Sequence, residues 1–129
     1  MRNIDGKEMN AVLKLDGPGR FTHFIKQVVD RERAWGLWSD GWALMAQDDG
    51  TSVFPLWPAK EYAKLCAVED WAGYEPSEIG LDELLAELAP KLKARGVRAG
   101  IFPTPTGKGI VIDVDELCGA LKEELGRYE

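Results

Sequence analysis

The sequence predicts an α+β fold in which a three-stranded antiparallel meander is extended by later strands and covered by amphipathic helices. Three observations lead to this prediction: apolar residues recur at helical spacing in several segments, short aromatic and β-favouring runs occupy residues 35–57, and Asp-Gly pairs separate those runs. The chain has 129 residues, 45% of them hydrophobic and 29% charged, which is enough for one domain with a sizeable core.

Two helices are predicted at the amino end. Met9, Val12 and Leu13 recur at helical spacing, and the glycines and proline of residues 16–19 should end that short helix. A second helix to about residue 33 is predicted by the helical spacing of Phe21, Phe24, Ile25, Val28 and Val29. We therefore expect residues 1–19 to form an N-terminal extension with a short helix, and residues 20–129 to form a single α+β domain.

The meander is predicted from three runs at residues 35–38, 42–46 and 52–57. Residues 40–41 separate the first two runs, residues 48–50 separate the last two, and both connections end in Asp-Gly. Asp-Gly between apolar runs indicates a hairpin, because glycine accepts the positive φ that tight turns need.

A helix, an irregular segment and a second helix are expected next. Pro58 suits the first position of a helix to about residue 69, because its missing N–H would have no partner there in any case. Residues 70–80 are expected to be irregular or briefly extended. Five leucines on one face then predict a helix: Leu81, Leu84, Leu85, Leu88 and Leu92. Pro90 should kink this helix, because it removes a backbone hydrogen bond, and Gly96 should end it.

Two strands and a last helix complete the predicted fold. The strands are expected at residues 97–102 and 109–112, and the helix face consists of Val114, Leu117, Cys118, Leu121 and Leu125. Asp113, with Glu116 three residues later, has the form of a capping box at the start of this helix.

Composition limits the partners and the compartment. The net charge of −6 makes the chain repel phosphate backbones, so we expect no nucleic-acid partner. No uncharged stretch is long enough to span a bilayer, and charges within the first eight residues leave no apolar signal-peptide core. We therefore expect no membrane partner and a cytoplasmic location. Cys66 and Cys118 lie in apolar surroundings and are expected to be reduced, buried and inert.

The sequence lacks the motifs of common catalytic and metal sites. His23 is the single histidine and is expected to be a structural or surface residue. Without a second histidine, and with the two cysteines far apart in sequence, a zinc site has no recognisable spacing. No serine lies within Gly-x-Ser-x-Gly, and Lys108 is followed by glycine and a β-branched run where a phosphate loop needs Ser or Thr and a helix. We expect no enzyme activity, no cofactor and no metal. An enzyme would need His23 beside a cysteine or carboxylate in a cleft.

Acidic residues and tryptophans coincide in the middle of the chain. Residues 34–80 hold all five tryptophans, with eight acidic and two basic side chains. Tryptophan is a preferred interface anchor, and carboxylates steer a basic partner toward it. The hypothesis is therefore a non-catalytic, adaptor- or immunity-like protein that docks a basic protein partner. Its predicted contact residues are Trp38, Asp40, Trp42, Asp48, Asp49, Trp57, Trp71 and Tyr74.

Other interpretations of the same residues are open. The tryptophans can instead build the core while the acids solvate turns, because each indole buries a large apolar area. The indoles can also line a small-molecule pocket in which Tyr62, Tyr74 or Thr104 orients the ligand. Homodimerisation through exposed indoles is compatible with the partner-docking, small-molecule and enzyme interpretations.

Five short motifs occur in an order that resembles a known family. They cover residues 35–37, 40–43, 54–58, 74–76 and 102–105, and read WGL, DGWA, FPLWP, YEP and FPTP. Together they resemble a bacterial family known only as domain of unknown function 2750, with a likeness that spans about residues 20–121. The resemblance implies a small, single-domain, cytosolic α+β protein, and it supplies no catalytic residue, cofactor or substrate.

Overall fold

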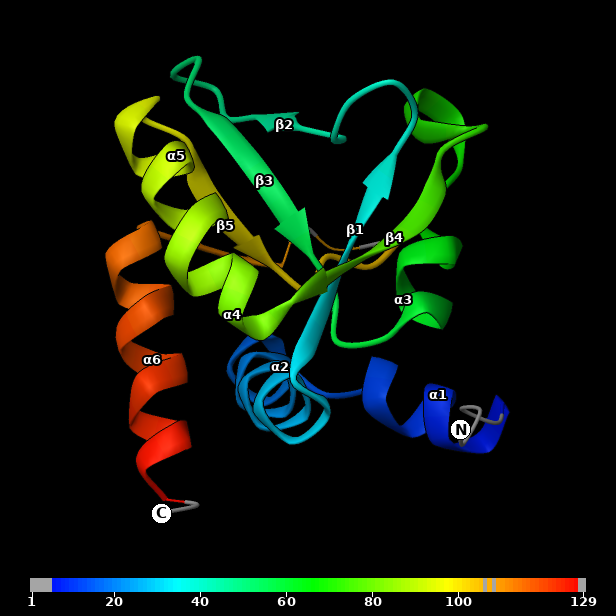
Figure 1. Cartoon of the computed structure of the whole chain (residues 1–129). Helices are drawn as coiled ribbons and strands as arrows, with labels where there is room; N and C mark the ends of the chain where they lie inside the picture. Colours follow the sequence, from blue (N-terminus) through cyan, green and yellow to red (C-terminus); the bar gives the residue numbers. More distant parts are fainter. Residues whose placement is uncertain (1–5, 106, 108, 128–129) are drawn as a thin grey trace.

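Strands and helices interleave along the chain, and the fold class is α+β, as predicted (Figure 1). The structure, a computed structural model, describes residues 6–105, 107 and 109–127. In chain order the elements are α1 (Gly6–Leu13), α2 (Gly17–Arg31), β1 (Arg33–Trp38), β2 (Met45–Ala46), β3 (Ser52–Leu56), α3 (Lys60–Leu65), the 3₁₀ turn η1 (Glu69–Trp71), β4 (Glu75–Gly80), α4 (Leu81–Glu83), the π turn η2 (Leu84–Leu88), α5 (Ala89–Ala94), β5 (Arg98–Ile101), β6 (Ile110–Ile112) and α6 (Val114–Gly126).

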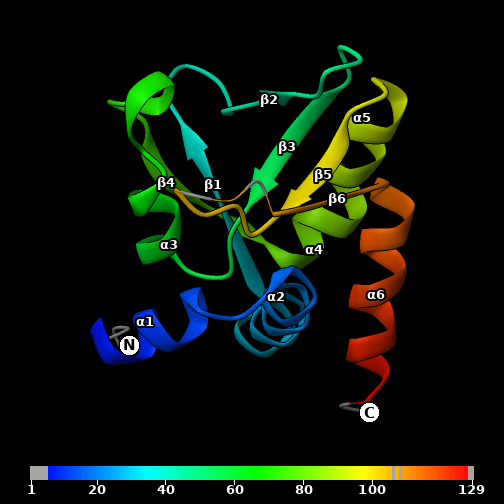
Figure 2. The same ribbon diagram turned by 180° about the vertical axis from the view of Figure 1, so that it is seen from behind.

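Two sheets are joined at one point. The larger has the order β2-β3-β5-β6, with β3 and β5 parallel and the other pairs antiparallel. The smaller is the antiparallel pair β1-β4. Trp35 and Trp57 exchange two backbone hydrogen bonds of 2.9 Å each, which fix β1 to the residue after β3. Beyond this bridge β1 diverges from β3, and we call the separation of these two strand backbones the split between the sheets (Figures 1 and 2).

Strand pairing differs from a simple three-strand succession. β2 and β3 form the expected hairpin, but β1 pairs along its length with β4 and meets the segment before β2 only at the Trp38–Trp42 bridge. β4 lies where an irregular or briefly extended segment was expected. Its sequence, Glu-Pro-Ser-Glu-Ile-Gly, has no alternating apolar pattern, so its strand conformation depends on pairing with β1.

The N-terminus of α2 lies within the segment expected to separate two helices. Asp16 is the N-cap, and its Oδ1 accepts a 2.7 Å hydrogen bond from the Gly19 N–H. Pro18 fits in the first turn because it needs no N–H partner there. The buried face of α2 carries the predicted apolar residues Phe24, Ile25, Val28 and Val29.

The helix from Leu81 to Ala94 contains a wide turn just before Pro90. In η2 the Ala89 N–H donates to the Leu84 carbonyl, five residues back. The disturbance expected from Pro90 thus takes the form of a π turn between α4 and α5. α3 is shorter than predicted, because Pro58 and Ala59 precede its first turn and it ends at Leu65.

The expected capping box at α6 is wrong. Asp113 occupies the N-cap position, but its side chain makes no capping hydrogen bond and instead pairs with Arg98 at 2.9 Å. Asp115 pairs with Lys93 of α5, also at 2.9 Å. These carboxylates therefore tie α6 to β5 and α5 rather than closing the first turn of their own helix.

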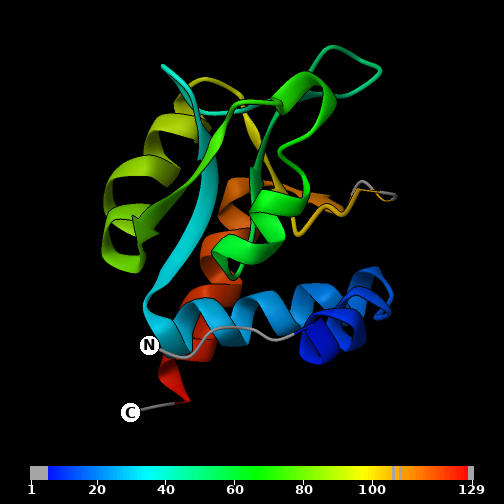
Figure 3. The same ribbon diagram turned by 90° about the vertical axis from the view of Figure 1, so that its right-hand side faces the viewer.

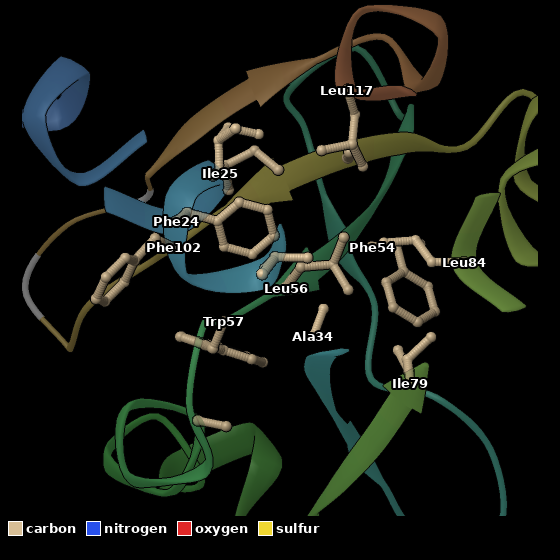
Figure 4. Packing of buried hydrophobic residues seen from close by; sticks show 14 of the residues in the cluster. Phe24, Ile25, Ala34, Phe54, Leu56, Trp57, Ile79, Leu84, Phe102 and Leu117 are labelled. Atoms are coloured by element: carbon tan, nitrogen blue, oxygen red, sulfur yellow. The ribbon is translucent and has the colours of Figure 1, made fainter. Parts of the chain in front are cut away.

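The core lies where the two sheets meet the helices (Figure 4). Phe54 of β3 lies beside Leu84 and Ile79, whereas Leu56 lies toward Phe24. All of these side chains are almost fully buried. None of the helices in the described part of the chain is long and apolar enough to cross a membrane.

Candidate functional site

Trp57 has to be removed from the predicted contact residues. Its indole is fully buried (0% exposed) and donates a 2.8 Å hydrogen bond from Nε1 to the Pro103 carbonyl. The Trp35 bridge holds its backbone inside the fold, and Figure 4 shows the ring within the core. For this tryptophan the interpretation as a core residue is the right one.

Trp42 closes the split between the sheets. Its ring packs so closely on Gly36 of β1 that a Cβ added there would lie 2.9 Å from the indole. The ring centroid lies 5.5 Å from that of Phe54 and 5.0 Å from that of Trp38, with the two indoles at 82°. Half-buried Trp42 therefore forms the floor beneath Trp38.

Trp38 is the exposed member of this pair. It ends β1 and leaves 42% of its surface accessible. Asp40, two residues on, is also exposed and adopts a left-handed conformation with φ 55° in the tight connection to Trp42. Both residues lie at the surface, where a partner can reach them.

One hollow lies beside η1, and we call it the Trp71 groove. Its volume is about 700 Å³, and its walls include Leu44, Val68, Glu69, Asp70, Trp71 and Thr104. Leu44 and Val68 are 46% and 51% exposed, unusually high for large apolar side chains. Trp71 is half-buried and packs edge-on against Trp57 at 6.2 Å. Two carboxylates and no basic side chain line this groove within the described residues.

A second hollow lies between α5 and the split between the sheets, and we call it the α5 pocket. It measures about 500 Å³, and Trp38, Trp42 and Phe54 form its aromatic wall. The opposite wall contributes four charged side chains: Glu83, Glu87, Lys91 and Arg95. Leu44 lines both hollows, so the two are neighbours across the segment that leads into β2.

Asp48 and Asp49 occupy the turn between β2 and β3. Both are exposed, and Asp49 accepts a 2.9 Å hydrogen bond from the Thr51 N–H. This hydrogen bond lowers the pKa of Asp49, so the carboxylate stays charged at neutral pH. The turn, β2, the end of β1 and η1 all lie at one end of the molecule (Figures 1 and 3).

The polar residues considered for orienting a ligand are separated. Tyr62 is buried against Phe102, with ring centroids 4.8 Å apart, and burial raises its pKa to about 12. Its hydroxyl has no hydrogen-bond partner among the described residues. Thr104 does line the Trp71 groove, whereas half-buried Tyr74 is not among the residues that line either hollow.

His23 and the cysteines lie in apolar surroundings. His23 is half-buried on α2 and packs 6.2 Å from the Phe102 ring, and burial lowers its pKa. Burial raises the pKa of the Cys66 thiol to about 11, and it raises that of half-buried Cys118 as well. Both thiols are free. No group of acidic, histidine or cysteine side chains suited to a metal ion occurs in the described part of the chain.

Sequence reasoning missed Leu44, Val68 and the charged side of the 83–95 helix. Leu44 and Val68 stand in the apolar runs of residues 42–46 and 65–68, and such runs normally indicate burial, so the sequence gives no signal for the exposure of these two side chains. The position of the α4–α5 helix opposite Trp42 depends on long-range packing of Leu84 and Ile79 around Phe54 (Figure 4).

Comparison with known proteins places the chain in a family without assigning a chemistry. Neither the curated proteins nor the solved structures contain a significant match. A family model described as a protein of unknown function matches residues 21–121, so α1 falls outside the matched region. The match covers most of the chain, including every tryptophan and both hollows. The protein therefore belongs to the DUF2750 family.

Proposed function

We propose that this protein is a non-catalytic binding domain that docks a basic protein partner through one end of the molecule. We call this surface the tryptophan edge: Trp38, Asp40, Leu44, Asp48, Asp49, Val68, Glu69, Asp70 and Trp71. The observation that supports the proposal is the coincidence of exposed large apolar side chains with five carboxylates at this one end of the molecule.

The apolar part of the edge is suited to anchor a partner. Trp38, Leu44 and Val68 are exposed, and Leu44 connects the two hollows in which Trp38 and Trp71 lie. Clustered apolar side chains at a surface cost free energy in water and commonly mark interaction sites. Indoles at the centre of such sites often contribute most of the binding energy.

The carboxylates favour a basic partner. Asp40, Asp48, Asp49, Glu69 and Asp70 surround the apolar side chains, and all five are exposed. The whole chain carries a net charge of −6, so its long-range field also attracts cations. A partner with lysines and arginines around an apolar contact would associate faster at low salt than an uncharged one.

The test compares variants for capture of partners from an extract of the native host, followed by affinity measurements on the purified partner. Trp38→Ala and Trp71→Ala should each weaken binding about 30-fold, which corresponds to about 2 kcal/mol for an anchor residue. The double variant Asp48→Asn with Asp49→Asn should slow association at low salt and have little effect above about 0.5 M salt.

Leu15→Ala provides the matched control. Leu15 is also an exposed large apolar residue, but it lies between α1 and α2, away from the tryptophan edge. Its substitution should leave binding unchanged. A partner that binds Trp38→Ala and Trp71→Ala as tightly as the unmodified protein would contradict the proposal. If the captured partner is a second copy of this chain, sizing will show a concentration-dependent mass, and docking of a basic partner is overturned.

A further inference from the structure

We propose that the α5 pocket binds a small zwitterion with a flat apolar body, the chemical class that includes free aromatic amino acids. This inference does not depend on the basic partner of the tryptophan edge. The pocket shares Trp38 and Leu44 with that edge, but its distinguishing side chains are Glu87 and Lys91, which lie outside it. Four features of the pocket support the assignment.

The aromatic wall of the pocket forms a corner. The Trp38 and Trp42 rings meet at 82° with centroids 5.0 Å apart, and Phe54 is tilted by 56° against Trp42 at 5.5 Å. A flat guest placed in such a corner contacts the face of one ring and the edge of another, and these are the arrangements that aromatic pairs prefer. The wall therefore selects a planar apolar body.

The size of the pocket suits a small molecule. Its volume of about 500 Å³ lies inside the range of roughly 300–1,000 Å³ that is typical of ligand sites. Leu88 and Leu92 complete an apolar interior opposite the indoles. Transfer of an aromatic ring from water into this interior is favourable.

Charges of both signs line the helical wall in a defined order. Glu83 and Glu87 come first along the helix, and Lys91 and Arg95 follow at the same spacing of four residues. None of the four makes an ion pair with another described residue. Residues four apart on a helix have Cβ atoms about 6 Å from each other. The flexible side chains of Glu87 and Lys91 can therefore reach the adjacent ammonium and carboxylate groups of one α-amino acid. A ligand with a single charge would be attracted by one of these two side chains and repelled by the other.

The π turn helps to keep these four side chains on one wall. In a regular α-helix each step of four residues overshoots a full turn by about 40°, so residues 83 and 95 would lie about 120° apart. The additional residue per turn in η2 takes back part of this overshoot, because η2 lies between Glu83 and Ala89. π turns are frequently found at functional sites, which is consistent with a ligand site here.

The experiment measures binding of L-phenylalanine and L-tryptophan by calorimetry and by changes in the indole N–H signals of the protein in NMR spectra. Four probes lack part of the proposed ligand: phenethylamine has no carboxylate, 3-phenylpropionate has no ammonium, N-acetylphenylalaninamide has neither charge, and L-alanine has no ring. We expect at least one aromatic amino acid to bind ten or more times as tightly as each of these probes.

Two exposed residues test the charge assignment separately. Glu87→Gln should weaken the amino acid but not 3-phenylpropionate, and Lys91→Gln should weaken the amino acid but not phenethylamine. Glu123→Gln and Lys122→Gln, exposed on α6 and outside the pocket, are the matched controls and should bind like the unmodified protein.

Several outcomes would overturn the proposal. They are no saturable binding of either amino acid up to about 10 mM, equal binding of the uncharged or singly charged probes, and equal weakening by the control substitutions. The result is distinguishable from failure at the tryptophan edge, because Glu87→Gln and Lys91→Gln should leave docking of a basic partner intact.

Discussion

The carbonyl oxygen of Pro103 accepts two hydrogen bonds from buried side chains. One comes from Trp57 Nε1 at 2.8 Å, and a longer one comes from Cys66 Sγ at 3.5 Å. A buried carbonyl needs such partners, because it has lost its contacts with water. Trp57 thus ties the loop after β5 to the core, whereas Trp38 has no comparable constraint and remains at the surface.

Trp57→Phe should lower the free energy of unfolding by about 1–3 kcal/mol, because the ring still fills much of the space but the Pro103 carbonyl loses its main donor. Trp38→Phe, the same substitution at an exposed position, should change it by less than about 0.5 kcal/mol. Urea denaturation of the two variants measures both values. Equal effects of the two substitutions would contradict the buried role of Trp57.

His23 should make the stability depend on pH. Burial lowers its pKa below 6.5, although the Glu8 carboxylate opposes this shift and Arg31 adds to it. Between this lowered pKa and about pH 6.5, the imidazole is therefore mainly neutral in the folded protein and mainly protonated in the unfolded chain, so unfolding takes up a proton. The free energy of unfolding should decrease as the pH falls through 6.5 and level off below the lowered pKa.

In the variant His23→Gln, the part of this decrease that is due to the imidazole should disappear, and urea titrations between about pH 7.5 and 5 test this. Identical slopes would mean that the pKa of His23 is unchanged on folding.

Among the elements, β1 shows how a single small residue determines a large aromatic contact. Gly36 leaves room for the Trp42 ring, which would lie 2.9 Å from a Cβ at that position. Ile79 of β4 also approaches this Cβ position, at 3.5 Å, so an added methyl group would meet side chains of two neighbouring segments. The floor of the α5 pocket therefore depends on a glycine in the middle of a strand.

Gly36→Ala should destabilise the protein by about 1–3 kcal/mol, because the added methyl group forces the indole to shift within a packed environment. Gly119→Ala is the matched control. Gly119 is exposed on α6 with no atom within 4 Å of an added Cβ, so this substitution should be neutral or stabilise by up to about 1 kcal/mol. Thermal or urea unfolding distinguishes the two, and a neutral Gly36→Ala would show that Trp42 is loosely packed.

The elements also show what could be predicted from the sequence. α2, the β2–β3 hairpin, β5, β6 and α6 follow from apolar spacing and Asp-Gly turns, because these signals are local. β4 could not be found in this way, since Glu75–Gly80 becomes a strand only by pairing with β1. The exposure of Trp38 and the burial of Trp57 depend on the same long-range pairing, so the pattern alone could not separate them.

In the whole molecule, most of the residue pairs between neighbouring strands join segments that lie far apart in the chain. β3 pairs in parallel with β5, with Val53 opposite Arg98 and Leu56 opposite Ile101. β2 covers only two residues of the other edge of β3. Much of the backbone of this central strand therefore obtains its hydrogen bonds from a segment more than 40 residues away in the chain.

A fragment that ends at residue 96 should remain unfolded, because β3 would lack β5 and α2 would lack α6. Poorly dispersed amide signals in NMR spectra and loss of protection from hydrogen exchange would confirm this. A fragment with native-like dispersion would instead show that β1, β4 and α2 form an independent unit.

The parallel pairing of β3 with β5 has a consequence during translation. When the ribosome has added Leu56, it still has 45 residues to add up to and including Ile101, which takes about 2–9 s at typical elongation rates. Throughout that interval β3 can pair with β2, and Trp57 with Trp35, but the edge of β3 that pairs with β5 in the folded protein has no partner. The nascent polypeptide should therefore be a good client for a chaperone until its β5 segment is released.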